Sequence, residues 1–217
     1  MDALSSIWPI FRLVIQTPNL VLRLPVDSDL TSLARQARLL EDSSAQSYYL
    51  PWIYEPSPGM ERQLVQRHWR ALAHWRPESW NLQFAIYIND RPVGCQSIWA
   101  NDFATIRSVG TGSWIAPPYQ GKGYGTEARA AVLNLAFTYL GAEEAHSEYI
   151  EGNAASVGVS RKLGYVSNGR RRSYRDDKGV IIQNDMLLDR SAWLANHEHW
   201  PDSTVHGLAI CREMFGE

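Results

Sequence analysis

The stretch GSWIAPPYQGKGYGTE, residues 112–127, decides the fold of this chain. It joins the end of an apolar strand, a double proline, three closely spaced glycines and a helix that opens at Thr126. Prolines lack the N–H that a strand ladder needs, so the strand must stop at Pro117. Glycines allow a turn with converging N–H groups, and a helix N-terminus adds partial positive charge. The stretch therefore predicts a binding site for an anion such as pyrophosphate, with Lys122 adding a full charge.

Two common nucleotide-binding loops do not fit this stretch. Lys122 is followed by Gly123, whereas a Walker loop has Ser or Thr at that place. The glycine spacing is G-x-G-x-G, which differs from the dinucleotide fingerprint.

Helical and strand periodicities alternate on both sides of the glycine stretch. Asp27 or Ser28 is expected to cap a first helix, Pro77 to end a second, and Gly141 to end the helix that follows the glycines. Asn153 is expected to cap a further helix that stops at Gly164. The pattern predicts strands over 19–24, 82–88, 93–99, 109–116, 145–150, 166–174 and 180–188, a hairpin turn at 176–179, helices over 28–40, 60–75, 126–140 and 154–163, and a last helical piece from 191.

Composition bounds the class of protein. The chain has 217 residues, 45% of them apolar, which favours one domain with a sizeable core. The formal net charge of −2 argues against general binding of nucleic acid or of an anionic membrane. We expect no membrane span and no signal peptide. Two distant cysteines, Cys95 and Cys211, favour a reducing cytoplasm as the location.

The glycine stretch resembles a motif of the GNAT superfamily of acyl-CoA-dependent N-acyltransferases. The pyrophosphate loop of that family reads Q/R-x-x-G-x-G/A, and this chain has QGKGYG at 120–125. A second segment, NAASVGVSRKLGY at 153–165, is similar to the N-x-x-S...KLGF/Y segment of the ribosomal-protein N-terminal acetyltransferase branch. The resemblance covers roughly residues 17–190. It implies a mixed α+β fold, with a mostly antiparallel central sheet flanked by helices, in one GNAT-like domain.

The resemblance also implies which residues bind the cosubstrate, acetyl-CoA or another acyl-CoA. The strand before the double proline is expected to pair with pantetheine, with a backbone N–H polarising the thioester carbonyl. The loop and the start of the next helix are expected to bind pyrophosphate, and the helix cap to bind the CoA arm. The expected cofactor-binding residues are Trp114, Ile115, Ala116, Gln120, Gly121, Lys122, Gly123, Tyr124, Gly125, Thr126, Asn153 and Ser156.

Catalytic residues are less determined by the sequence. Many family members carry a Tyr that protonates the departing thiolate, and this chain has Ser160 at that position. Ser160 is a candidate donor to the sulfur, although a serine in a helix is more often packed or solvated. Asp102 and Asp185 are candidate bases, although such aspartates are more often surface or turn carboxylates, and Glu127 is better explained by the helix dipole.

The acceptor site is predicted from aromatic side chains in a long loop and the helix and strands beyond it. Trp52 and Trp99 are the expected substrate-binding residues, with His68 and Trp69 as further wall candidates; all four also suit a core. Cys95 has no local His partner and is expected to be buried. The histidines are dispersed, so we predict no metal site.

The sequence thus predicts an N-acyltransferase, most simply an acetyltransferase, that moves an acyl group from acyl-CoA to a primary amine of a protein, peptide or small molecule. The alternative is a catalytically weak acyl-CoA-binding regulatory protein. The expected partners are acyl-CoA and the amine, with a homodimer left open. We expect an N-terminal extension at 1–16, the acyltransferase domain at 17–190, and a C-terminal extension at 191–217 that packs on the domain.

Overall fold

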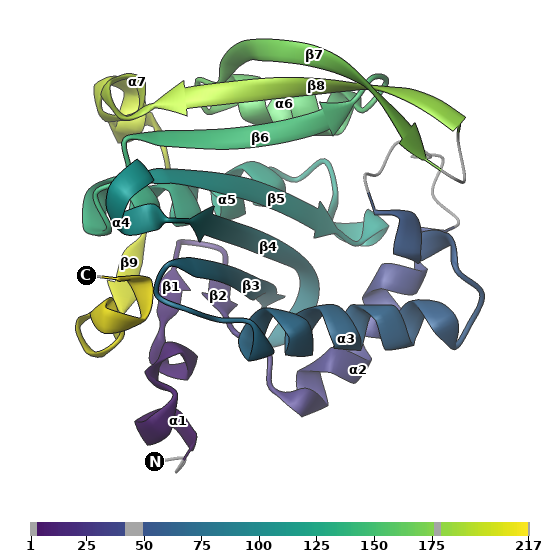
Figure 1. The fold of residues 1–217 in the computed structure, drawn as a ribbon. Coiled ribbons are helices and arrows are strands. Elements are labelled where there is room, and N and C mark those ends of the chain that lie inside the picture. Colours follow the sequence, from purple (N-terminus) through teal and green to yellow (C-terminus); the bar gives the residue numbers. More distant parts are fainter. Residues whose placement is uncertain (1–3, 42–49, 176–178, 217) are drawn as a thin grey trace.

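The computed structural model describes residues 4–41, 50–175 and 179–216, and its central feature is one nine-stranded sheet (Figure 1). The strand order is β7-β8-β6-β5-β4-β3-β2-β1-β9. The strands are β1 (Val14–Gln16), β2 (Val21–Arg23), β3 (Ser79–Ile88), β4 (Arg91–Asn101), β5 (Ser108–Ile115), β6 (Glu144–Ile150), β7 (Val166–Arg175), β8 (Gly179–Asp189) and β9 (Thr204–His206).

The sheet is antiparallel except where β5 meets β6. These two strands run parallel and pair only from Ser108↔Glu144 to Thr111↔Ser147. Beyond that point β5 continues to Ile115 and β6 to Ile150, so a gap opens between them. Every other pairing between described strands is antiparallel. The predicted mixed, mostly antiparallel sheet is confirmed, and its one parallel pair creates the gap.

Helices cover both faces of the sheet. The longer ones are α2 (Asp27–Arg38), α3 (Gly59–Ala73), α5 (Tyr124–Asn134) and α6 (Ala154–Lys162). A π-helical turn continues α5 over Leu135–Tyr139, and Gly141 then takes a positive φ of 67°, as expected for a helix terminator. Short pieces complete the described chain: α1 (Leu4–Ile7), α4 (Phe103–Ile106), α7 (Arg190–Asn196), and 3-10 turns at Pro9–Arg12, Pro51–Tyr54, Pro117–Tyr119, His197–His199, Leu208–Ile210 and Arg212–Phe215.

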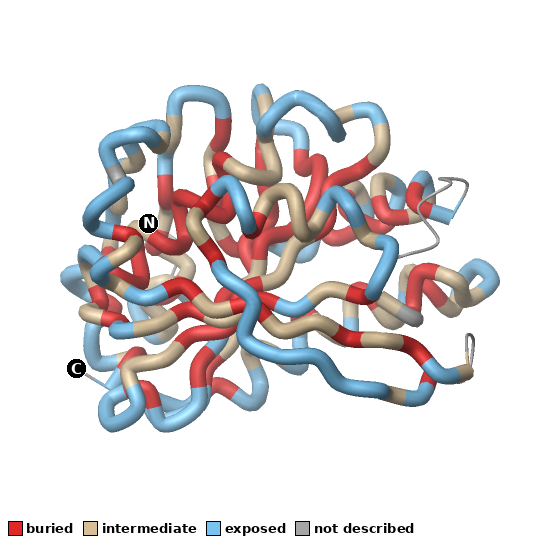
Figure 2. Tube along the Cα trace, turned by 90° about the horizontal axis from the view of Figure 1, so that it is seen from above, coloured by how far each residue is buried: buried red, intermediate tan, exposed pale blue. Residues whose placement is uncertain are grey.

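Each face of the sheet packs against its own apolar cluster. The buried residues run through the middle of the molecule (Figure 2). Side chains of α5 pack with Leu82, Phe84 and Ile98 of the sheet in the larger cluster. Side chains of α2 and α3 pack with Cys95 and Trp114 in the smaller one. The two clusters use alternate residues of the same strands, as a pleated sheet requires. We call the first side the α5 face and the second the α3 face.

Three helix ends differ from expectation, and one of them is the start of α5 at Tyr124 instead of Thr126. The cap of α2 is Val26, one residue before the predicted Asp27, because the carboxylate of Asp29 accepts a hydrogen bond from the Val26 N–H at 3.1 Å. Helix α3 ends at Ala73, well before Pro77. Asn153 caps α6 as predicted, with its side chain accepting from the Ser156 N–H at 3.0 Å. The predicted turn at 176–179 falls largely on residues 176–178, which lie outside the described residues.

Both ends of the chain enter the sheet. Strand β1 pairs with β2 on one side and with β9 on the other. After β9, Phe215 is fully buried, edge-on to Trp75 and Trp80. The indole N–H of Trp75 donates to the Met214 carbonyl at 2.8 Å. The segment 197–217, unassigned from the sequence beyond position 196, thus contributes a strand and core side chains.

Candidate functional site

A cleft of about 1320 Å³ is lined by residues from both faces of the sheet. It is bordered by the parting ends of β5 and β6, by the glycine loop before α5, and by the start of α6 on one side. On the other side it is bordered by α3 and by strands β3 and β4. The gap between β5 and β6 is therefore where a molecule on one face can meet a molecule on the other.

The glycine loop has the geometry of an anion site. Gly121 and Gly123 take positive φ values of 71° and 87°, which glycine adopts without strain. Gly123 is the N-cap of α5, and the N–H groups of Tyr124 and Gly125 have no acceptor among the described residues. These N–H groups and the helix dipole suit a phosphate.

The structure places most of the expected cofactor-binding residues on the cleft. Ala116 and Lys122 are the exceptions: Ala116 is fully buried with its N–H bound to the Val93 carbonyl, and the Lys122 ammonium lies over the Tyr119 ring. Gln120 uses its side-chain amide to donate to the Ile115 carbonyl at 2.7 Å, which ties the loop to β5. The expected residues that line the cleft are Trp114, Ile115, Gln120, Gly121, Gly123, Tyr124, Gly125, Thr126, Asn153 and Ser156.

Backbone groups of β5 face the gap. The Ala116 N–H donates to the Val93 carbonyl of β4. In an antiparallel pair, every second residue of β5 directs its N–H toward β4 in this way. Ser113 and Ile115 therefore direct their N–H groups away from β4 and toward β6, where the ladder has ended. These N–H groups are available to a ligand in the gap.

Ser160 does not reach the cleft, contrary to its expected role as a donor to sulfur. It is fully buried and is not among the cleft-lining residues. Its hydroxyl instead accepts a hydrogen bond from Nη1 of Arg129 at 2.9 Å. Arg129 itself lines the cleft and also donates to the hydroxyls of Ser147 and Ser113, both at 3.2 Å.

Arg129 is the site residue that sequence reasoning missed. Its signal was present, because residues 128 and 130–133 around it in α5 are all apolar, and an arginine among buried neighbours needs hydrogen-bond partners. Glu127, two residues earlier, is also buried and accepts hydrogen bonds from the Thr17 hydroxyl at 2.6 Å and from Asn19. Glu127 thus holds the β1–β2 turn in addition to lying in the first turn of α5.

The α3 face of the cleft carries its tryptophan side chains. Trp52 is 5% exposed and lies edge-on to Trp114, with ring centroids 6.4 Å apart. Trp99 lies across Gly110, where a Cβ would come within 2.3 Å of the Trp99 ring. Both tryptophans line the cleft, whereas Trp69 is exposed and does not.

Titratable groups on the α3 face offer few free bases. His68 lines the cleft, and burial together with the nearby Arg67 charge lowers the pKa of His68 to about 4. Glu55 accepts a hydrogen bond from Gln63, and Glu148 pairs with Arg171 at 2.8 Å.

The two aspartates considered as bases lie elsewhere. Asp102 is exposed and does not line the cleft, and its backbone rather than its carboxylate makes the first turn of α4. Asp185 pairs with Arg171 at 2.6 Å and does not line the cleft either.

Other chemistries find little support in the described part of the chain. Burial raises the pKa of Cys95 to about 12, so this thiol stays protonated. Within residues 4–41, 50–175 and 179–216, no three His, Cys, Asp or Glu side chains are grouped to hold a metal ion. No helix in these ranges has the length and apolar character to cross a membrane.

Comparisons with known proteins agree with this geometry. The acetyltransferase (GNAT) domain family matches residues 19–166. Among solved structures, the ribosomal L7/L12 alpha-N-protein acetyltransferase RimL in complex with CoA aligns with a TM-score of 0.66 and 16% identity, covering 82% of this chain and 99% of that one. A GNAT-family acetyltransferase from Bacillus anthracis aligns with a TM-score of 0.65, 16% identity and the same two coverages.

A third structure is the microcin C7 self-immunity acetyltransferase MccE in complex with acetyl-CoA and AMP. It aligns with a TM-score of 0.65 and 18% identity, covering 79% of this chain and 93% of that one. At these identities the structures support the fold, and the domain match covers more than half of the sequence. The chain therefore belongs to the GNAT acetyltransferase family, and it is an acyl-CoA-dependent N-acyltransferase that uses acetyl-CoA.

Proposed function

We propose that this enzyme transfers the acetyl group of acetyl-CoA to the primary α-amine of a peptide or protein, by direct attack in a ternary complex. The observation that carries the proposal is the cleft with two sides. It has a phosphate-type loop on the α5 face and an aromatic pocket on the α3 face, and the two meet at the gap between β5 and β6. A cosubstrate and an acceptor can thus be bound together without a covalent enzyme intermediate.

In the proposed complex, the loop 120–125 and the start of α5 bind the pyrophosphate. The N–H groups of Ser113 and Ile115 bind the pantetheine arm and polarise the thioester carbonyl, as an added strand would. Asn153 and Ser156 lie where α6 borders the same side of the cleft. Trp52 and Trp99 bind the acceptor on the opposite side.

The choice of an α-amine follows from the groups on the α3 face. The carboxylates there, Glu55 and Glu148, are engaged by other side chains. Of the two histidines, His68 is a weak base, and the His146 ring lies 3.4 Å from the Glu144 carboxylate. An α-amine with a pKa of about 7.7 to 8.0 is partly neutral near pH 7, whereas a lysine amine near 10.4 needs a strong base. The RimL structure, described as an alpha-N-protein acetyltransferase, is similar in fold.

Release of CoA from acetyl-CoA across a panel of amines tests the proposal. Peptides with free α-amines should be turned over, and the same peptides with blocked N-termini and one lysine should be turned over at least tenfold more slowly. Because the neutral amine is the nucleophile, kcat/KM should rise with pH and level off near the pKa of the acceptor amine. Preference for lysine or for a small non-peptide amine would contradict the acceptor assignment. Binding of acetyl-CoA with no turnover on any amine would favour the regulatory alternative.

A pair of glycine substitutions tests the acceptor side separately. An alanine at Gly110 would displace the Trp99 ring, whereas at Gly112 its Cβ would lie 3.4 Å or more from any neighbour. Gly110→Ala should therefore raise the acceptor KM far more than Gly112→Ala, with similar acetyl-CoA affinity in both. Equal effects of the two substitutions would remove Trp99 from the acceptor pocket.

A further inference from the structure

Arg129 is a buried cation without a counter-ion. The residue is only 3% exposed. No carboxylate in the described part of the chain forms an ion pair with it. Its Nε has no hydrogen-bond partner in the structure. A guanidinium stays protonated in proteins, and a buried charge is costly unless another charge compensates it. The site therefore lacks a negative charge that something else must supply.

Three serine hydroxyls hold the guanidinium in place. They come from Ser113 on β5, Ser147 on β6 and Ser160 on α6, at 3.2, 3.2 and 2.9 Å. All three accept hydrogen bonds from Arg129, and being neutral they orient the charge without compensating it. The guanidinium is thus fixed across the two strands that part at the gap.

The position of Arg129 matches the place of reaction. It lines the cleft on the α5 face, the side that also carries the glycine loop, while Ser160 lies behind it and is fully buried. An acyl group bound on this face becomes accessible to an amine on the α3 face only through the gap. Arg129, bonded to Ser113 of β5 and Ser147 of β6, therefore lines the cleft on the side of the gap where the thioester is proposed to bind.

The reaction creates a negative charge at that place. The amine nitrogen forms a bond to the carbonyl carbon, the carbon–sulfur bond breaks, and its electron pair leaves on sulfur as a thiolate. The extra proton of the amine passes to water. We propose that Arg129 is a further catalytic residue, whose guanidinium donates a hydrogen bond to the CoA sulfur and stabilises it as the departing thiolate. This inference rests on the proposed acyl transfer and deepens it.

Other titratable groups lie near the gap, and the experiment must control for them. Tyr165 is close enough to Arg129 to interact with its charge and shares a hydrogen bond with the Thr111 hydroxyl, and burial raises the pKa of Tyr165. Lys162 of α6 lines the cleft on the same side, and His146 and Glu148 of β6 line it from the α3 face. The experiment must therefore isolate the contribution of the sulfur from that of these groups.

Desulfo-CoA, which lacks only the sulfur, provides that isolation. The affinities of the full-length protein for CoA and for desulfo-CoA are measured by calorimetry from pH 6 to pH 9. If the thiolate is stabilised, its bound pKa falls below the thiol reference of about 8.5, and CoA gains affinity as pH rises through that bound value. The ratio of the two affinities should then increase about tenfold across this range for each unit by which the pKa falls.

Substitutions assign the effect to Arg129. Arg129→Met should abolish the rise in the affinity ratio and lower kcat about 100-fold, with a smaller change in the KM for acetyl-CoA. Arg129→Lys, which keeps the charge, should restore part of both. Arg161→Met is the matched control, because Arg161 is exposed on α6 and does not line the cleft.

Several outcomes would overturn the inference. One is a ratio independent of pH in the unmodified protein, a result that needs no variant and stands even if Arg129→Met does not fold. Another is a rise that persists in Arg129→Met. A third is loss of affinity for a carboxylated acyl-CoA such as succinyl-CoA in Arg129→Met with the rise retained, which would make Arg129 a reader of the acyl chain. Failure of the protein to bind either CoA or desulfo-CoA would instead overturn the proposed function.

Discussion

The buried His68 in the cleft should make the stability of the protein depend on pH. Burial first, and the neighbouring Arg67 charge second, lower its pKa from 6.5 to about 4. Between pH 6.5 and about pH 4, His68 is therefore protonated in the unfolded chain and neutral in the folded chain. Stability should be fully present above pH 6.5 and should fall by about 3 kcal/mol as pH decreases to about 4.

Denaturant unfolding at a series of pH values measures this loss. His68→Gln should remove the slope between pH 6.5 and 4, because glutamine does not titrate. His74→Gln is a suitable control, since His74 is exposed at the end of α3. An unchanged slope in His68→Gln would assign the acid sensitivity to other groups.

Comparing variants at Gly123 and Gly141 distinguishes the effect of backbone strain from an effect on ligand binding. Both have positive φ values, 87° and 67°, and open space where a Cβ would lie. Alanine at either position should cost about 1 to 2 kcal/mol of stability through strain. Only Gly123→Ala should also weaken acetyl-CoA binding, because Gly123 begins α5 at the anion site. Calorimetry that found equal acetyl-CoA affinity in the two variants would contradict the assignment of the loop.

At the level of single residues, the sequence predicted positions better than roles. The glycine loop and the Asn153 cap could be recognised because their conformations depend on local residue types. Ser160 was expected to face sulfur, and only the packing of α5 against α6 shows that Arg129 lies in front of it. The apolar neighbours of Arg129 in α5 indicated its burial, but its three serine partners come from β5, β6 and α6, and no local pattern shows that these elements meet.

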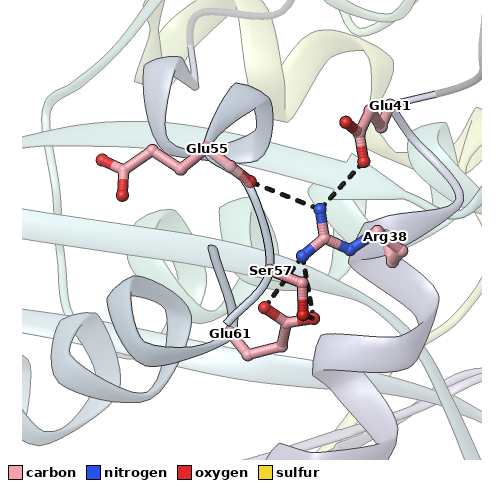
Figure 3. Close-up of polar contacts among 5 residues, drawn as sticks. All are labelled: Arg38, Glu41, Glu55, Ser57 and Glu61. Atoms are coloured by element: carbon pink, nitrogen blue, oxygen red, sulfur yellow. Dashed lines mark hydrogen bonds and ion pairs between the residues drawn. The ribbon is translucent and has the colours of Figure 1, made fainter. Parts of the chain in front are cut away.

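Helices α2 and α3 are joined by a cluster of charges around Arg38 (Figure 3). Its guanidinium donates to Glu61 of α3 and to Glu41, each at 2.8 Å, and to the Glu55 carbonyl at 3.3 Å. The Ser57 hydroxyl donates to the same Glu61 carboxylate. Since Glu55 also lines the cleft, the cluster fixes one border of the acceptor side.

Arg38→Met should loosen this border and raise the acceptor KM several-fold, with little change in acetyl-CoA affinity. The hydrogen bond from Arg38 is the main cause of the lowered pKa of Glu61. Its stabilising effect is therefore present above the ordinary Glu pKa and is lost as pH falls through the lowered value. The difference in melting temperature between Arg38→Met and the unmodified protein should accordingly be larger at pH 7 than at pH 3. A difference independent of pH would show that Arg38 acts through packing alone.

Secondary-structure elements with local signals could be predicted, and those that depend on distant partners could not. The hairpin of β3 and β4 could be recognised because apolar residues alternate from Leu82 to Ile88 before a turn at Asn89 and Asp90. Strands β1 and β9 have three residues each, too short for a recognisable pattern, and they pair with each other from opposite ends of the chain. The gap between β5 and β6 could not be predicted either, because it depends on where their pairing stops.

On the scale of the whole molecule, the last residues of the chain support the core beneath β3. Phe215 packs with Trp75 and Trp80, and Trp80 in turn contacts Phe103. Phe215→Ala should therefore cost about 3 to 5 kcal/mol in denaturant unfolding. Ile210→Ala, at a residue 46% exposed in the same segment, should cost about 0.5 kcal/mol or less. Similar small losses for both would show that the C-terminal segment is dispensable for the core.

The pairing of β1 with β9 also has a consequence for biosynthesis. A ribosome makes β1 long before β9, so β1 has only β2 beside it until residues 204–206 have been synthesised. During that time the outer edge of β1 presents unpaired N–H and C=O groups, the kind of edge at which two chains can join. Emergence of β9 from the ribosome supplies the strand that closes this edge. Nascent chains that stall before residue 204 should therefore be more prone to aggregate than chains stalled after β9 has emerged, which sedimentation of the two sets of stalled chains would measure.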